Sequence, residues 1–263
     1  MEINRRKLKD IDIELALERG RLKYVEKLKG LYGVDTETLQ DGRVFMLTDS
    51  DGKCITGFEF DDYFKFLVQK SHRGKIGYFY NTRFDVDGIF NLSPDKSIKE
   101  GIVGNNWFKY KNYEIRNTGY KGLRIRKLDE KGVEKKVWYF FDISNFFPVY
   151  GLNECAEIYL HQKKKDIDVT KFNSIDWVNK HLEEIRDYCI QDSKLTQELA
   201  EYWQVRSGEF GFIHYPEYSI ASYSSKLFAN NCNIPLLRYI PKEVINYSWG
   251  SYQGGRFELL QKG

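Results

Sequence analysis

The chain has 263 residues, of which 41% are hydrophobic and 16% aromatic. This length suffices for one large domain, or for one domain and part of another, and it can bury a core without disulfides. The formal net charge of +3 is too small to indicate a nucleic-acid partner by itself. The four cysteines form no CxxC pair and lie at no zinc-like spacing to the four histidines, which favours reduced thiols. Without a signal peptide or a long apolar span, we expect a soluble, intracellular protein with no membrane partner.

Hydrophobic patterns predict strands first and then mixed strands and helices, which is typical of an α/β or α+β domain. The first half is predicted to contain an amphipathic helical arm at 1–30, a strand from 31 into the acidic residues near 35–38, a hairpin of 44–47 and 54–60, a helix at 61–69, a strand at 75–80 and a helix at 84–91. The second half is predicted to contain antiparallel strands within 101–142, a helix at 152–160, a loop at 163–172, a helix at 176–203 capped by Ser174, a helix at 217–230 and a loop at 250–256.

Two carboxylates, Asp35 and Glu37, lie two residues apart on the first predicted strand. Strand side chains alternate, so both point to one face of the sheet. Neighbouring carboxylates repel each other, and a bound cation is the natural reason for placing them together. Asp-x-Glu is common by chance, so the pair alone does not define a metal site.

Two further clusters follow along the chain. Asn81-Thr82-Arg83-Phe84-Asp85 lies where a buried strand meets a helix, at the kind of sheet edge where ligands bind. Asp85 alone would also fit a helix N-cap. Tyr188 and Asp192 are four residues apart on a predicted helix and therefore share a face, although such spacing is more often a surface pair.

Taken in order, strand Asp-x-Glu, Asn-x-x-Phe-Asp and helical Tyr-x-x-x-Asp resemble the three motifs of the DEDDy 3′→5′ exonucleases. The resemblance implies a ribonuclease H-like fold, with a mixed sheet flanked by helices, and hydrolysis of the 3′-terminal phosphodiester. It implies two divalent cations, Mg²⁺ or Mn²⁺, one lowering the pKa of the attacking water and the other neutralising the leaving oxygen. Mg²⁺ and Mn²⁺ prefer oxygen ligands, whereas zinc prefers His or Cys ligands, which these motifs lack. The implied metal ligands are Asp35, Glu37, Asp85 and Asp192, and Tyr188 is implied to orient the water.

The segment Tyr78 to Asp85 also resembles the second exonuclease motif of protein-primed family B DNA polymerases. In that family the Asn and the aromatic residue before the acid hold the single-stranded 3′ end, which assigns Asn81 and Phe84 to DNA binding. Stacking suits a proofreading enzyme because every base has a π-face. Thr38, directly after the Glu, is implied to contact DNA near the terminal nucleotide.

Two shorter matches extend this resemblance. Ser144-Asn145-Phe146-Phe147 is similar to the family's Ser-Leu motif for single-stranded DNA, with Asn in place of the usual Leu, and implies DNA binding by Ser144. Lys164-Lys165-Asp166-Ile167 is similar to a Lys-x-x-hydrophobic motif whose lysine supports catalysis by offsetting phosphate charge. The spacing selects Lys164; its neighbours Lys163 and Lys165, or a plain basic loop, are the alternatives.

Tyr252-Gln253-Gly254-Gly255-Arg256 resembles the Tyr-x-Gly-Gly motif that joins exonuclease to polymerase in family B. The glycines let the backbone approach phosphates closely, and the alternative is a simple Gly-Gly turn. The resemblance implies DNA contacts by Tyr252, Gly254, Gly255 and Arg256. The predicted domains are the helical arm (1–30), an exonuclease domain (31–210) and a connector into the polymerase palm region (211–263).

None of the acidic polymerase motifs follows, so we expect the N-terminal part of a polymerase or one subunit of a split polymerase. The expected partners are a single-stranded DNA 3′ end, primer-template DNA, a polymerase domain or subunit and, for a protein-primed enzyme, a terminal protein. A stand-alone DEDDy nuclease acting on RNA or DNA and a non-catalytic single-strand-binding subunit stay open as alternatives. A metal-dependent phosphatase would not explain Asn81, Phe84 or Tyr188.

Overall fold

The computed structural model describes residues 30–104, 106–147, 150–209, 219–231 and 241–244. The chain consists of two compact units, Met1–Ser222 and Tyr223–Gly263. The helical arm expected at 1–30, except Gly30, and the Tyr-x-Gly-Gly segment lie outside the described residues. In the part of the chain that is described, no helix combines the length and the apolar character needed to cross a membrane.

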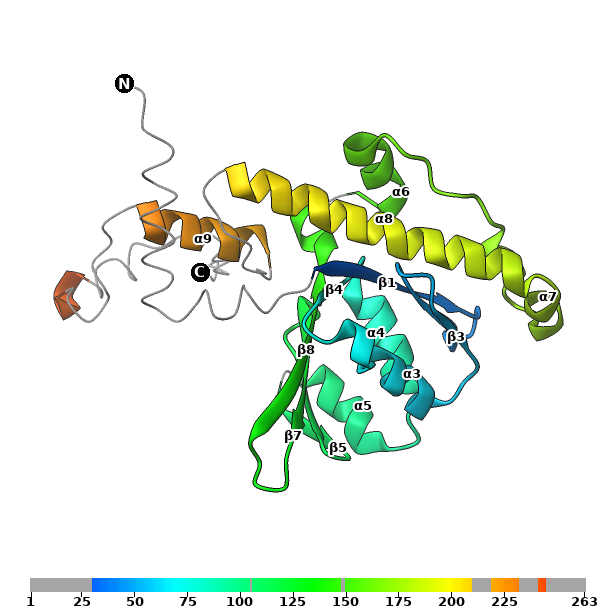
Figure 1. Cartoon of the computed structure of the whole chain (residues 1–263), viewed down its shortest axis with the longest axis horizontal. Helices are drawn as coiled ribbons and strands as arrows, with labels where there is room; N and C mark the ends of the chain where they lie inside the picture. Colours follow the sequence, from blue (N-terminus) through cyan, green and yellow to red (C-terminus); the bar gives the residue numbers. More distant parts are fainter. Residues whose placement is uncertain (1–29, 105, 148–149, 210–218, 232–240, 245–263) are drawn as a thin grey trace, which may run out of the picture. The chain divides into compact units, whose positions relative to one another are not determined.

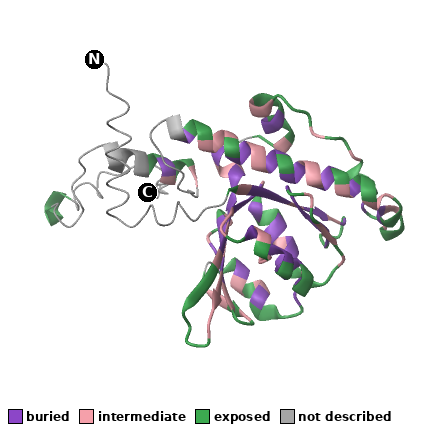
Figure 2. Ribbon diagram, in the orientation of Figure 1, coloured by how far each residue is buried: buried purple, intermediate pink, exposed green. Residues whose placement is uncertain are grey.

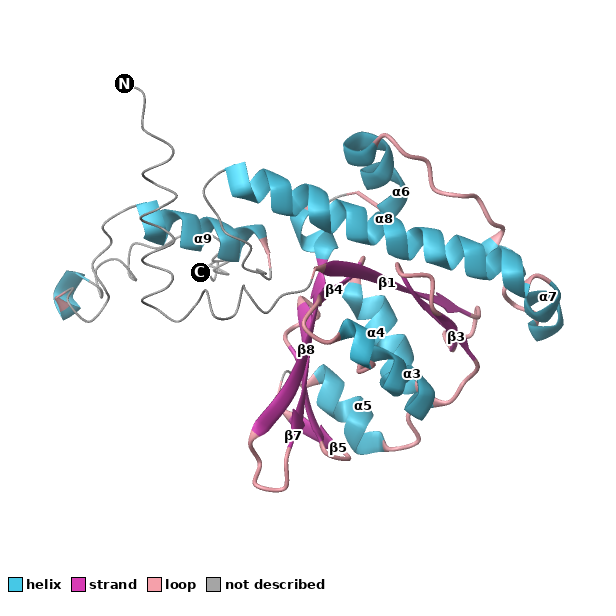
Figure 3. Ribbon diagram, in the orientation of Figure 1, coloured by secondary structure: helices cyan, strands magenta, loops and turns pink. Residues whose placement is uncertain are grey.

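An eight-stranded mixed sheet organises the first unit (Figure 3). Its strand order is β3-β2-β1-β4-β8-β7-β6-β5. β1, β4 and β8 run parallel to one another, and the other neighbouring strands pair antiparallel. The strands are β1 (Leu31–Thr38), β2 (Val44–Asp49), β3 (Cys54–Thr56), β4 (Ile76–Phe79), β5 (Phe108–Tyr110), β6 (Tyr113–Asn117), β7 (Gly122–Leu128) and β8 (Glu134–Asp142).

Helices cover both faces of this sheet (Figure 1). The long helix α8 crosses one face over β1, and α3, α4 and α5 pack on the other. The helices are α3 (Phe60–Leu67), α4 (Thr82–Asn91), α5 (Lys96–Val103), α6 (Leu152–Cys155), α7 (Ile175–Lys180), α8 (Leu182–Glu209) and α9 (Ile220–Asn231), with short turns η1 (Lys70–His72), η2 (Ile143–Phe146), η3 (Ala156–Leu160) and η4 (Val169–Lys171). This arrangement is consistent with the ribonuclease H-like fold expected from the sequence.

The main core lies between the sheet and α3, α4 and α5 (Figure 2). Tyr32 and Val34 point into it, so the alternation of β1 turns Gly33, Asp35 and Glu37 to the opposite face, toward α8. A side chain at Gly33 would place its Cβ 1.8 Å from the carbonyl oxygen of Ser193 on α8. Glycine therefore lets α8 rest directly on β1, beside the acidic residues.

One helix replaces part of a predicted strand region. The sequence was expected to form strands from 101 onward, but α5 extends through Val103. Ile98 and Ile102, four residues apart, are both buried, which is a helical spacing, and the Asp95 side chain caps the helix by accepting from Ser97 N. The antiparallel strands predicted after it are confirmed as β5 to β8.

Two predicted boundaries were also wrong. The hairpin strand predicted at 54–60 ends at Thr56, because Phe60 already begins α3 and points into the core. The single helix predicted at 176–203 is two helices, which separate at His181. The His181 ring stacks on Trp177 at 4.1 Å, and its Nδ1 lies 2.8 Å from the Trp177 carbonyl oxygen, which ends α7. Ser174 caps α7 as predicted, accepting from Trp177 N.

Candidate active site

The predicted site residues cluster where the three parallel strands end. β4 ends at Phe79, and its pairing with β1 stops at Gly33, so β1 continues to Thr38 without a neighbour on that side. The chain turns from β4 into α4 at this open edge, and β8 ends beside it at Asp142. Carboxyl ends of parallel strands are where ligands bind in such sheets.

Asp35 and Glu37 point to the same side of β1, as their spacing predicted. Their carboxylate oxygens and the sulfur of Cys189 lie within 4.8 Å of one another. Glu37 is buried and Asp35 is half-buried beneath α8. Two carboxylates so close and so poorly hydrated repel each other strongly.

Asp85 lies in the first turn of α4 and does not cap it. Its Oδ1 accepts a hydrogen bond of 2.6 Å from the Thr36 hydroxyl of β1. The N-cap position is Asn81, so the alternative that Asp85 is a simple N-cap is wrong. Burial raises the pKa of Asp85 to about 8, against the opposing effect of the Thr36 hydrogen bond, and the charge of Asp142 raises it further.

Lys164 connects the two residues of the helical motif. Its Nζ lies 2.5 Å from Oδ2 of Asp192 and 4.6 Å from the centroid of the Tyr188 ring. Tyr188 and Asp192 therefore share the face of α8 that the sequence predicted. Lys163 and Lys165 are exposed, so of the three lysines Lys164 is the one at the site.

Burial raises the pKa of all four acids, and for Asp35 and Glu37 the charges of the other acids raise it further. Burial and then the charges of Asp192, Glu37 and Asp85 hold the pKa of Asp35 well above its usual value. Burial, followed by Asp192, raises the pKa of Glu37 to about 8, although Lys164 opposes this. Burial likewise raises the pKa of Asp192 to about 6 despite Lys164 and Tyr188. Additional positive charge at this position would favour the ionised form of all four groups.

A divalent cation fits this donor set. Oδ1 of Asp192 is buried and has no hydrogen-bond partner among the described residues, so it retains a lone pair for a ligand. The remaining donors are carboxylate oxygens, which Mg²⁺ and Mn²⁺ prefer. A cation bound here would neutralise the repulsion between the acids, and this electrostatic gain favours its binding.

Cys189 was missed as a neighbour of the acids. Its sulfur lies 3.5 Å from both the carbonyl oxygen and Oδ2 of Asp35, and it accepts a hydrogen bond of 3.2 Å from Thr48. The sequence did not predict a sulfur beside these acids. Burial and the nearby acids raise the pKa of the thiol, which keeps it a hydrogen-bond donor. Its helical spacing from Ile185 looked like ordinary core, and this spacing gave no signal of a second role.

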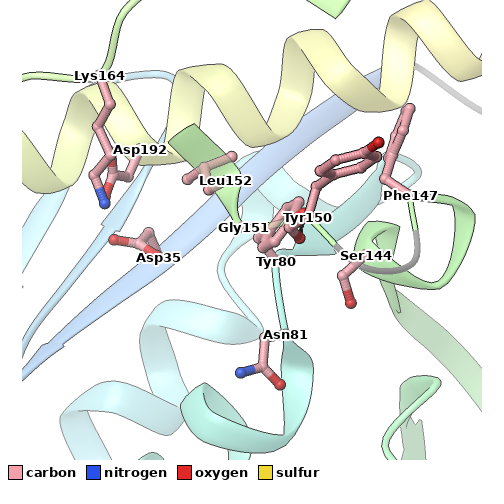
Figure 4. Close-up of a pocket in the computed structure, with 10 residues that line it drawn as sticks. All are labelled: Asp35, Tyr80, Asn81, Ser144, Phe147, Tyr150, Gly151, Leu152, Lys164 and Asp192. Atoms are coloured by element: carbon pink, nitrogen blue, oxygen red, sulfur yellow. Dashed lines mark hydrogen bonds and ion pairs between the residues drawn. The ribbon is translucent and has the colours of Figure 1, made fainter. Parts of the chain in front are cut away.

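A pocket of about 490 Å³ opens beside the acids (Figure 4). Asp35, Asp192 and Lys164 lie at one end, and the aromatic side chains gather at the other. The Tyr80 hydroxyl donates to the carbonyl oxygen of Tyr150 at 2.6 Å, which fixes two walls of the aromatic end. The lining residues are Asp35, Tyr80, Asn81, Ser144, Phe147, Tyr150, Gly151, Leu152, Lys164 and Asp192.

Asp142 organises the turn that carries two predicted DNA-binding residues. Its carboxylate accepts hydrogen bonds from the backbone N–H groups of Asn81, Thr82 and Ser144, at 3.0, 3.1 and 2.9 Å. Asn81 has a left-handed backbone with φ of 68°, and the bond to its N–H helps to hold that conformation. Sequence reasoning missed Asp142, although a carboxylate at the end of a buried strand was a usable signal.

The other predicted DNA-binding residues differ in exposure. Phe84, in the first turn of α4, is 54% exposed, an unusual position for a large apolar side chain. Thr38 is half-buried at the end of β1, and Ser144 is half-buried in η2. Asn145, which replaces the family's Leu, donates its side-chain amide to the Asp142 carbonyl oxygen at 3.3 Å. The residues predicted at 252–256 lie outside the described part of the chain.

The sequence matches no protein-family model and no curated protein. Among solved structures, the chain is similar to phi29 DNA polymerase complexed with primer-template DNA and incoming nucleotide substrates, with a TM-score of 0.54 and 15% sequence identity. That alignment covers 88% of this chain and 40% of the polymerase chain, so the chain spans about two fifths of that protein's length. An orthorhombic crystal form of phi29 DNA polymerase aligns with a TM-score of 0.48 and 17% identity, over 76% of this chain and 34% of that one. The first likeness shows a shared fold.

Proposed function

We propose that the chain is a metal-dependent 3′→5′ exonuclease that trims single-stranded DNA ends, as the proofreading part of a protein-primed family B DNA polymerase. The observation that carries the proposal is the convergence of acids from β1, α4 and α8 beside Lys164, at one end of a pocket. The fold shared with phi29 DNA polymerase supports a polymerase-related role. In this proposal 31–210 form the exonuclease domain and 211–263 lead toward the polymerase region.

Asp35, Glu37, Asp85 and Asp192 would hold two divalent cations, Mg²⁺ or Mn²⁺. Bound there, such ions supply a water of lowered pKa and positive charge against the leaving oxygen. Asp192 and Asp35 are the acids that reach the pocket itself, and Glu37 and Asp85 lie deeper. The pocket end with the two accessible acids is therefore where the scissile phosphate would lie.

Two side chains at this end would act on the reacting groups directly. Although burial lowers the pKa of the Lys164 ammonium, the charge of Asp192 raises it overall, and this cation would offset the negative charge that develops on the phosphate. Burial raises the pKa of Tyr188, so its hydroxyl stays protonated and can orient a water through hydrogen bonds. Nζ of Lys164 lies 4.6 Å from the centroid of the Tyr188 ring, which supports a shared role of the two groups at one phosphate.

The aromatic end of the pocket would receive the 3′-terminal nucleotide. Tyr80, Phe147 and Tyr150 offer apolar surface there, while Asn81 and Ser144 offer polar groups. The exposed Phe84 ring provides a stacking surface for a further base. Stacking on aromatic rings tolerates any base, which a proofreading enzyme requires.

The test is a gel assay of the full chain with 5′-labelled single-stranded DNA in Mg²⁺, in Mn²⁺ and in EDTA. We expect a ladder that shortens from the 3′ end, depends on metal, and disappears in the Asp35→Ala/Glu37→Ala double variant. That variant should still bind the oligonucleotide. Wild-type cleavage by the double variant would show that the site assignment is wrong.

Parallel substrates separate the remaining alternatives. Equal degradation of RNA and DNA would favour a general DEDDy nuclease over a DNA proofreading enzyme. Binding without cleavage in either metal, by folded protein, would favour a non-catalytic single-strand-binding subunit. Preferential removal of a mismatched 3′ nucleotide from primer-template DNA is the result expected for proofreading.

A further inference from the structure

Lys164 lies in a segment without regular secondary structure. The segment runs from His161 to Asp168, between η3 and η4, and both neighbours of Lys164 are exposed. Such a loop has many accessible backbone conformations. Lys164 Nζ nevertheless lies 2.5 Å from Oδ2 of Asp192, so other contacts must fix the backbone of the loop.

Gln191 makes those contacts from the neighbouring position on α8. Its side-chain Nε2 donates to the Lys163 carbonyl oxygen at 3.2 Å, and its Oε1 accepts from the Lys165 N–H at 2.8 Å. One amide group thus holds the backbone immediately before and immediately after Lys164. We call this pair of hydrogen bonds from Gln191 the clamp. Because Gln191 directly precedes Asp192, the same turn of α8 carries both the clamp and the acid that Lys164 contacts.

Two further bonds support the same segment. The Lys164 N–H donates to the Asn153 side chain of α6 at 3.3 Å. Gln162 donates to Glu198, seven residues beyond Gln191 on α8, at 2.5 Å. The segment therefore runs along one side of α8 and is attached to it at two separate points.

The ion pair itself is a weak anchor for the backbone. The Lys164 side chain is 22% exposed and has four rotatable bonds, so many backbone positions would let its ammonium reach Asp192. A direct pair of hydrogen bonds to the main chain restricts the loop far more. Glutamine suits this position because it offers one donor and one acceptor side by side; glutamate cannot donate, and asparagine is one methylene shorter.

We infer that Gln191 is a positioning residue that fixes the backbone on both sides of Lys164 and thereby sets the lysine ammonium against Asp192 and Tyr188. The clamp is a property of the folded chain, and its consequence for catalysis rests on the proposed exonuclease function. Gln191 touches neither the pocket nor the reacting groups, so it acts through Lys164.

The kinetic test compares Gln191→Met, which keeps the length and loses both bonds, with Gln197→Met. Gln197 is a matched control because it is half-buried on the same helix and, among the described residues, its side chain bonds only to Glu201. With 5′-labelled single-stranded DNA, Gln191→Met should lower the single-turnover rate by roughly tenfold, the loss expected from two hydrogen bonds, with unchanged DNA affinity. In a Lys164→Ala background, Gln191→Met should cause no further loss.

The structural test is limited trypsin digestion of the full chain in EDTA, followed by mass spectrometry of the fragments. Trypsin cleaves after lysine, and Lys163, Lys164 and Lys165 lie in the clamped segment. Gln191→Met should speed cleavage at these bonds by roughly tenfold, because local opening exposes them, while Gln197→Met should leave the rate unchanged.

Each arm has an outcome that overturns the inference. Equal digestion of the two glutamine variants would show that Gln191 does not hold the segment. Gln191 would have no positioning role if Gln191→Met sped trypsin digestion but left the rate of DNA cleavage unchanged. The same conclusion would follow if Gln191→Met slowed DNA cleavage as much in the Lys164→Ala background as in the wild-type chain. If the wild-type chain cleaves no DNA, the proposed function fails, and the digestion still decides whether the clamp exists.

Discussion

Lys164 and Asp192 form an ion pair of 2.5 Å between a loop and a long helix, at the end of a pocket. The same ammonium lies over the ring of Tyr188, so one lysine contacts both residues of the helical motif. Its two lysine neighbours along the chain are exposed. Three adjacent lysines with the same formal charge therefore have different expected effects on the chemistry.

Replacing Lys164 by alanine should lower the single-turnover rate of cleavage by about 10²-fold, the typical loss when one charge-stabilising donor is removed. DNA affinity should change little, since the lysine acts on the phosphate under attack. Lys163→Ala and Lys165→Ala are the matched controls and should keep the wild-type rate. A loss of equal size in Lys165→Ala would mean that the wrong lysine has been assigned.

Asp142→Ala should both destabilise the protein and weaken DNA binding. The carboxylate satisfies three backbone N–H groups, and leaving them without a partner costs about 2–4 kcal/mol of the free energy of unfolding. Affinity for single-stranded DNA should fall because Asn81 and Ser144 lose their common anchor. Asp142→Asn keeps an acceptor oxygen and should lose less.

The control for this change is Asp95→Ala, which removes another aspartate that accepts from a backbone N–H, that of Ser97. Asp95 caps α5 at an exposed position, so its loss should destabilise the protein less than Asp142→Ala does. Denaturant unfolding and fluorescence anisotropy with a labelled oligonucleotide measure both quantities. Equal losses of DNA affinity in the two variants would show that Asp142 acts only through global stability.

The candidate acids were selected from sequence by an ordered resemblance to known motifs, and the local spacings within those motifs agree with the structure. Asp35 and Glu37 share a face through strand alternation, and Tyr188 and Asp192 share a helix face. Asp142 could not be connected with Asn81 in this way, because their contact depends on the register that pairs β8 with β4. Nothing local relates positions so far apart in the chain.

The role of Gln191 and the helix α5 are two further features that the sequence alone did not predict. Glutamine on an exposed helix face is ordinary, and its role becomes visible only once the loop is placed beside it. α5 has only eight residues and two buried isoleucines, so its helical period was too short to stand out from the strand-like pattern that follows. Close packing of α8 on β1 was equally hidden, since Gly33 looked like any strand glycine.

Phe84→Ala should weaken binding of single-stranded DNA by roughly 1–3 kcal/mol, the usual contribution of one stacked base. Stability should be almost unchanged because the ring is already 54% exposed. Phe58→Ala is a matched control, since this phenylalanine is 37% exposed and does not line the pocket. Unchanged affinity in Phe84→Ala would remove the ring from the binding surface.

Without metal, the free energy of unfolding should fall as the pH rises from about 4 to 8. Burial raises the pKa of Glu37 and Asp85 to about 8 in the folded protein, whereas an unfolded chain keeps values near 4. The folded state therefore binds more protons within this window, and stability decreases with rising pH by at most about 1.4 kcal/mol per pH unit for each extra proton. Below the unfolded pKa, both states are protonated and the slope vanishes.

Urea unfolding in EDTA at several pH values measures this slope. Glu37→Gln removes one of the titrating groups and should flatten the decline, because the amide stays neutral at every pH. Adding Mn²⁺ should raise stability more at pH 8 than at pH 5, since protons compete with the cation for the carboxylates. Stability that is constant or rising between pH 5 and 8 in EDTA would show that the acids are already compensated by groups of the protein, and the electrostatic reason for metal binding would be lost.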